Sequence, residues 1–196
     1  MRRADWLARQ APLPDYLAPN LDIVFVGINP GEQSARAGHY YANPRNPFWR
    51  LLHAAGLTPR ELRPDEDRLL PTFGYGITDI VKRPSRGLAD LGGGDFRRGR
   101  EVLAEKLLAY QPTIVCFNSM TGFSRFFGPG VPRRFGRRRL RIGDARVFVV
   151  PSSSPANAAF SFETKLRYFR GLRVWRDALR EAGWGMRDAE WKSAVP

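Results

Sequence analysis

Short apolar runs that alternate with stretches of helical periodicity are the feature of this sequence that most limits its fold. The runs are rich in β-branched residues and too short for helices, which is typical of strands buried on both faces. They lie at 21–26, 76–81, 113–117, 140–142 and 147–150. The alternation predicts an α/β fold, a three-layer α/β/α sandwich around a central, mainly parallel sheet.

Capping signals define the helices between these runs. Asn46 is predicted to cap a helix that has Pro47 at its first position and ends at Gly56. Asp95 is predicted to cap a second helix, and Gly143-Asp144 is expected to be a hairpin turn. The helix capped by Asp95 is expected over 96–109, and further helices are expected at 3–9 and 160–182. The apolar face expected for the helix over 96–109 consists of Val102, Leu103, Leu107 and Leu108.

The domain organisation is expected to be simple, because 196 residues suffice for one domain. Residues 1–20 are expected to form an N-terminal arm, residues 21–185 a single catalytic domain and residues 186–196 a C-terminal tail. No apolar run has the roughly 18–20 residues of a membrane span, and no signal-peptide core follows the N-terminus. We therefore expect an intracellular, cytoplasmic protein without membrane contact, and association with the nucleoid.

Charge and cysteine content narrow the class of function. The chain has 32 Lys and Arg against 19 Asp and Glu, a formal net charge of +13, so a polyanion such as nucleic acid is the first partner to expect. Its single cysteine, Cys116, excludes an internal disulfide and a Cys-rich metal centre. With only two histidines besides, a His-based metal site is not expected either.

Three unusual segments lie at the carboxyl ends of predicted strands, where ligands bind in parallel sheets. The first is Gly27-Ile28-Asn29-Pro30-Gly31, a tight turn with Asn29 as its polar side chain. The second lies at 78–83, and the third is Pro151-Ser152-Ser153-Ser154-Pro155-Ala156-Asn157. Its hydroxyls could grip phosphate. A plain turn at Asn29 and a simple Ser-rich connector remain alternatives. A serine nucleophile is disfavoured, because no Gly-x-Ser-x-Gly pattern is present.

The order of these motifs resembles the mismatch-specific uracil-DNA glycosylases and thymine-DNA glycosylases. The similarity covers about residues 20–182. It is carried by Gly27-Ile28-Asn29-Pro30-Gly31, Gly38-His39-Tyr40-Tyr41, Asn43-Pro44, Asn46-Pro47-Phe48-Trp49, Gly76-Ile77-Thr78-Asp79-Ile80-Val81, Tyr110-Gln111-Pro112 and Pro151-Ser152-Ser153-Ser154. The resemblance implies a uracil-glycosylase fold and a monofunctional hydrolase that cleaves the N-glycosidic bond of uracil, thymine or modified cytosine in double-stranded DNA. A monomer without cofactor is implied.

The resemblance also assigns roles. Asn29 matches the catalytic asparagine that positions water, and Tyr41 the aromatic residue that stacks on the flipped base. The backbone at Gly27 and Ile28 would hold the uracil edge, with an amide contributed by Asn118. Asp79 stands where relatives have lysine or asparagine. We expect it to supply acid–base chemistry alongside or instead of Asn29. A salt bridge to Lys82 or Arg83, or a capping role, is the alternative.

DNA contacts are expected from the last loop. Its central residue, Ala156, stands where relatives insert a large side chain, so weaker discrimination of the opposite base is expected. The full set of expected DNA contacts is Ser34, Ser152, Ser153, Ser154, Pro155, Ala156, Asn157 and Lys165. An arginine run could contact DNA or form a solvated, flexible loop. It consists of Arg133, Arg134, Arg137, Arg138, Arg139 and Arg141.

Alternatives to a uracil glycosylase remain. A non-catalytic nucleic-acid-binding domain would bind DNA without releasing a base. A superfamily relative could prefer another base, such as hypoxanthine. A serine hydrolase would be inactivated by serine-directed reagents.

Overall fold

A five-stranded sheet forms the centre of the molecule, in a computed structural model that describes residues 6, 7 and 9–184. The strands are β1 (Ile23–Gly27), β2 (Tyr75–Asp79), β3 (Ile114–Phe117), β4 (Gly136–Ile142) and β5 (Ala145–Val149). Their order is β2-β1-β3-β5-β4, and every neighbouring pair is parallel except β4 with β5. The predicted α/β fold with a mainly parallel sheet is confirmed.

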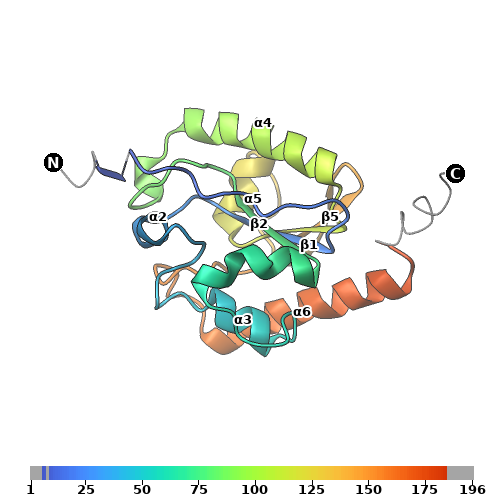
Figure 1. The fold of residues 1–196 in the computed structure, drawn as a ribbon. Helices are drawn as coiled ribbons and strands as arrows, with labels where there is room; N and C mark the ends of the chain where they lie inside the picture. Colours follow the sequence, from blue (N-terminus) through green and yellow to red (C-terminus); the bar gives the residue numbers. More distant parts are fainter. Residues whose placement is uncertain (1–5, 8, 185–196) are drawn as a thin grey trace, which may run out of the picture.

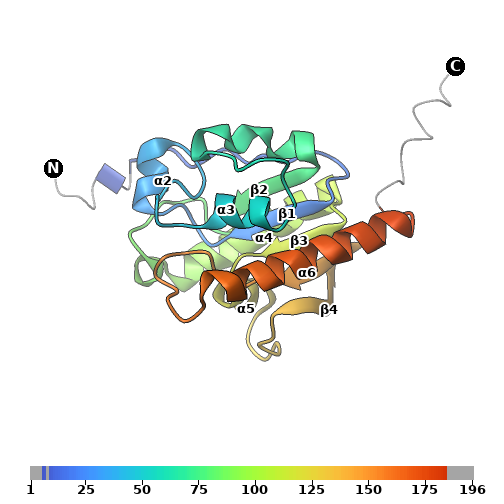
Figure 2. The same ribbon diagram turned by 90° about the horizontal axis from the view of Figure 1, so that it is seen from below.

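Helices cover both faces of the sheet (Figures 1 and 2). On one face lie α3 (Phe48–Ala54), α6 (Phe162–Glu181) and the 3-10 helix η1 (Pro64–Phe73), and on the other α4 (Gly93–Tyr110) and α5 (Met120–Phe127). Successive residues of β1 point to opposite faces, so Ile23 and Phe25 enter the first core and Val24 and Val26 the second. The three-layer architecture follows from this alternation.

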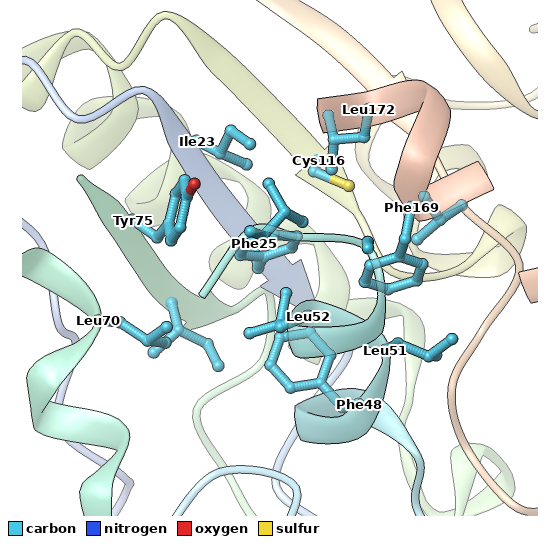
Figure 3. Close-up of a cluster of buried hydrophobic side chains, with 14 of the residues drawn as sticks. Ile23, Phe25, Phe48, Leu51, Leu52, Leu70, Tyr75, Cys116, Phe169 and Leu172 are labelled. Atoms are coloured by element: carbon cyan, nitrogen blue, oxygen red, sulfur yellow. The ribbon is translucent and has the colours of Figure 1, made fainter. Parts of the chain in front are cut away.

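Aromatic packing fixes the helices of the first layer against the sheet (Figure 3). The Phe25 ring meets Phe48 of α3 edge-on, with centroids 5.4 Å apart, and lies nearly parallel to Phe169 of α6 at 6.3 Å. All three side chains are fully buried. Each such burial stabilises the fold by about 1.5–3 kcal/mol, so the strand that carries Gly27 is held rigidly.

The helix predicted over 96–109 has a different start and a narrower apolar face. It begins at Gly93, and Asp95 is its third residue rather than its cap, accepting a 2.9 Å hydrogen bond from the Gly92 amide. Leu103 and Leu107 are buried, because they lie one turn apart on the face against the sheet. Val102 and Leu108 lie to either side of that face and are 40% and 52% exposed, so their assignment to the core was wrong.

Several elements have no clear signal in the sequence. These are α2 (Glu32–Ala37), η1, the short 3-10 helix η2 (Leu88–Asp90) and α5. Strand β4 starts at Gly136, four residues before the predicted run, because arginines break its apolar pattern. The arginine run is therefore not a flexible loop: much of it is an edge strand in which Arg137, Arg139 and Arg141 are exposed.

The N-terminal arm lies along the outer edge of β2. Tyr16 and Ile77 exchange two backbone hydrogen bonds of 3.1 and 3.0 Å in an antiparallel bridge. Most of the helix predicted at 3–9, and the tail at 186–196, lie outside the described residues. Within the described residues, no helix combines the length and apolarity needed to cross a membrane.

Candidate active site

The carboxyl ends of the four parallel strands meet at one edge of the sheet. Gly27 lies opposite Asp79 in the register of β1 and β2. The pairing continues past the strand ends, because the Ile80 amide donates to the Gly27 carbonyl (3.1 Å) and the Val81 amide to that of Ile28 (2.8 Å). The structure thus brings the turn at 27–31 beside the segment that begins at Asp79.

Asp79 is a buried carboxyl set directly against Gly27. Its side chain is 5% exposed, and among the described residues Oδ2 has no hydrogen-bond partner. Its Oδ1 overlaps the position that a Cβ on Gly27 would take, and the Tyr41 hydroxyl is 3.3 Å from that position. Only glycine at 27 leaves room for the carboxyl, so the glycine, the acid and the phenol form one small cluster.

Burial controls the charge of this acid. Loss of solvation raises the pKa of Asp79 from its usual value to about 7, the nearby Lys82 lowers it and the Asp15 carboxylate raises it. The alternative of a salt bridge is wrong, because Lys82 pairs with Asp15 (2.7 Å) and Arg83 with Asp95 (2.7 Å). A carboxyl that titrates near neutrality can both take up and release a proton under working conditions.

Asn29 is held in one orientation by its amide nitrogen. Nδ2 donates to Ser85 Oγ (2.8 Å), to the Pro30 carbonyl (3.0 Å) and more weakly to the Arg83 carbonyl (3.4 Å). Oδ1 is thereby left to accept a hydrogen bond from a water or ligand. Ser85 is a site residue that the sequence analysis missed, although a polar residue after Arg83-Pro84 beyond the second strand was a usable signal.

Tyr41 and Asn118 connect the first motif to the last loop. The Tyr41 ring stacks on Phe48 with centroids 3.9 Å apart, and its φ of 51° is rare for an aromatic residue. Its hydroxyl accepts from Asn118 Nδ2 (3.0 Å), which also donates to Ser153 Oγ (2.8 Å), while the Ser153 amide donates to Asn118 Oδ1 (3.1 Å). Both Asn118 polar atoms are occupied within the chain, so its contact with a base stays a prediction.

The Ser-rich loop is shaped by its own hydroxyls. Ser152 Oγ accepts from the Ser154 amide (3.2 Å), and Ser154 Oγ from the Ala156 amide (3.3 Å), which leaves Ala156 exposed beside Pro155. Asn157 Nδ2 donates to the Ser152 carbonyl (3.2 Å). The loop is therefore a preformed turn.

Three of the expected DNA contacts are buried. Ser153 is fully buried, Lys165 donates to the Asn157 carbonyl (3.2 Å), and Ser34 Oγ of α2 accepts from the Ala42 amide (3.2 Å). Each side chain supports a loop at this edge, and direct phosphate contact by any of them stays a prediction. The serine-hydrolase alternative lacks a base at the serines of this loop, since among the described residues His39 contacts Asp67, His53 contacts the Thr58 carbonyl, and neither contacts Ser152, Ser153 or Ser154.

A cavity of about 600 Å³ lies between the end of β2 and α4. Lys82, Arg83 and Leu103 are among its lining residues, and it includes Asp79 but not Gly27, Asn29 or Tyr41. Of the two reacting groups proposed from the sequence, Asp79 thus lines this cavity and Asn29 does not. Among the described residues no group of three or more His, Cys, Asp and Glu side chains could hold a metal ion.

The fold and this edge of polar groups define a class: a basic α/β protein with a buried, titratable acid and an oriented amide at the same end of its parallel strands. The family follows from comparison with known proteins. Residues 14–175 match the Uracil DNA glycosylase superfamily, and the chain belongs to that superfamily. The chain is also similar to the solution NMR structure of a Methanosarcina acetivorans protein that is provisionally described as a uracil DNA glycosylase. The identity is 26%, the TM-score is 0.52, and the match covers 84% of this chain and 98% of the other. Membership supports a DNA-repair glycosylase.

Proposed function

We propose that this protein is a monofunctional DNA glycosylase that flips uracil out of double-stranded DNA and hydrolyses its N-glycosidic bond. Thymine and modified cytosine opposite guanine are the further substrates proposed, as in the mismatch-specific branch of the superfamily. Flipping costs a few kcal/mol of unstacking, and this cost is lowest for a mismatched base. The observation that carries the proposal is the unpaired Asp79 carboxyl beside Gly27 at the edge where Asn29 lies.

The base would be held between the first motif and the last loop. The Tyr41 ring has one face on Phe48, and its other face would stack on the base, a contact worth about 1–3 kcal/mol. The backbone at Gly27 and Ile28 would receive the base edge. Ala156 at the last loop would enter the gap in the duplex, although its side chain is too small to fill it.

The chemical step needs a nucleophilic water and stabilisation of a cationic sugar. Loss of the base leaves an oxocarbenium-like sugar, which the Asp79 carboxylate would stabilise. The Asn29 Oδ1 would orient the water. The water oxygen bonds to C1′, its proton passes to Asp79, and the electron pair of the broken C1′–N bond leaves with the base.

Phosphate binding would extend beyond the crevice onto the edge strand. Two of the exposed arginines of β4 are Arg137 and Arg139, and the Arg137 guanidinium is 5.2 Å from the centre of the Trp175 ring of α6. Side chains two residues apart on one strand repeat at roughly 7 Å, about twice the axial spacing of phosphates on one DNA strand.

The decisive experiment incubates the protein with labelled duplexes that contain G·U, A·U, G·T or no lesion, followed by alkaline cleavage of abasic sites. We expect cleavage of the uracil duplexes, and losses of activity in both Asp79→Asn and Asn29→Ala. Salt-dependent binding with no abasic product from any duplex would instead identify a non-catalytic DNA-binding domain. Release of another base but not uracil would place the chain elsewhere in the superfamily.

A further inference from the structure

An ionic cluster at the outer edge of β2 ties the N-terminal arm to the end of the sheet that carries Asp79. The Asp15 carboxylate of the arm accepts three hydrogen bonds, from Thr78 Oγ1 (2.5 Å), Lys82 Nζ (2.7 Å) and Lys106 Nζ (2.6 Å). The donors come from β2, from the segment after it and from α4. The side chain of Asp15 is only 17% exposed, so these contacts are largely shielded from solvent.

Lys82 has a second anchor. Its ammonium also donates to the Tyr40 hydroxyl (3.0 Å), next to Tyr41 in the chain. Lys82 follows Asp79 by three residues, and both line the cavity between β2 and α4. Two acceptors therefore hold the ammonium close to the buried acid, while its ion pair is with Asp15. The arrangement places a fixed positive charge near Asp79 without neutralising it.

We propose that Lys82 is a positioning residue, whose ammonium, held by Asp15 and Tyr40, sets the charge state of Asp79. The inference rests on the proposed function for the catalytic importance of Asp79, but the charge state can be measured without any DNA. A cluster that only fastened the arm would alter stability and leave the titration of Asp79 where it is.

The charges around Asp79 act in opposite directions. Burial raises its pKa most, the Lys82 cation lowers it and the Asp15 anion raises it. Burial also raises the pKa of Tyr40 and of Tyr41, so both phenols are neutral hydrogen-bonding groups at working pH. Other charged side chains line the same cavity as Asp79, namely Arg83 and, on α4, Asp95, Arg98 and Lys106. Asp67 of η1 accepts a hydrogen bond from the Tyr40 amide and contacts His39.

Four variants of the full chain test the proposal, with Asp79 followed by carboxyl ¹³C NMR as pH is varied. Lys82→Met keeps the length of the stem and removes the charge, so the midpoint of Asp79 should move up by about one pH unit. Asp15→Asn removes a negative charge and should move the midpoint down. Lys106→Met is the control, since it removes an ion pair to Asp15 from α4 and should leave the midpoint unchanged. Lys82→Arg keeps the positive charge, so the midpoint of Asp79 should stay close to that of the unaltered protein.

The same displacements should appear in the pH profile of single-turnover base release. Opposite movements in Lys82→Met and Asp15→Asn would support the proposal. An unmoved Asp79 midpoint in Lys82→Met, or an equal displacement in Lys106→Met, would overturn it. If no duplex yields abasic product but the NMR midpoints move as expected, the proposed function fails and the electrostatic role of Lys82 stands.

Discussion

The buried acid makes a quantitative prediction about stability. The pKa of Asp79 is raised from 3.8 to about 7, because burial disfavours the carboxylate. The folded state therefore keeps a proton that the unfolded state has already lost between these two pH values. Stability should fall as pH rises from about 4 to about 7 and level off above that range. A shift of about three pKa units corresponds to about 4 kcal/mol at 1.36 kcal/mol per unit, as an upper limit.

Replacement by the neutral isostere Asp79→Asn removes this cost. The variant should be more stable than the unaltered protein at pH 8, and its advantage should shrink by about 3 kcal/mol at pH 5, since about two of the three units lie between pH 5 and pH 7. Urea unfolding at a series of pH values measures this difference. Asp65→Asn, at an exposed position of η1, is the control for an equal change in net charge.

The outcome separates a functional acid from a structural one. A gain in stability combined with loss of base release would indicate that the buried acid is kept at the expense of stability. A stability difference between Asp79→Asn and the unaltered protein that is the same at every pH, or smaller at pH 8 than at pH 5, would refute the reasoning about burial.

Three further predictions concern neighbouring residues. Gly27→Ala forces a methyl group onto the Asp79 carboxyl, so we expect a destabilisation of about 1–3 kcal/mol and loss of base release, measured by urea unfolding and the abasic-site assay. Ala156→Leu should raise the ratio of G·U to A·U cleavage, because a larger side chain fills the gap in the duplex better, and an unchanged ratio would contradict that role. Joint replacement of Arg137 and Arg139 by glutamine should make the slope of log affinity against log salt less negative by about 2, and an unchanged slope would contradict phosphate contact by these two arginines.

The sequence predicted the layers of this fold because its strands are apolar on both faces. Val24 and Phe25, for example, enter different cores. A strand buried on both faces is a continuous apolar run, which differs from the spaced apolar residues of a helix. Helix α5 was missed because Gly122 interrupts its pattern, although Ser119 caps it by accepting a 2.8 Å hydrogen bond from the Gly122 amide. The predicted range for β4 was too short because the prediction relied on apolar residues, whereas an edge strand can carry exposed charges.

The candidate site was only partly predictable, for a reason that lies in tertiary structure. Strand ends indicated Asn29 and Asp79 as candidates, because the carboxyl ends of parallel strands meet at one edge. The environment of Asp79 depends on the register that places it opposite Gly27, and the orientation of Asn29 depends on Ser85, 56 residues away. The contacts of Lys82 with Asp15 and Tyr40 likewise join distant segments. Spacing in the chain carries no signal for such contacts.

The bridge between Tyr16 and Ile77 bears on self-association, because it covers the edge strand β2. The unpaired backbone groups of an edge strand can pair with a strand of another molecule. Here the N-terminal arm occupies the edge at β2, and the arginines of β4 place like charges at the opposite edge, where two copies would repel each other. A shortened protein without residues 1–18 would lose the first of these barriers. It should then self-associate through β2 at concentrations where the full chain stays dispersed.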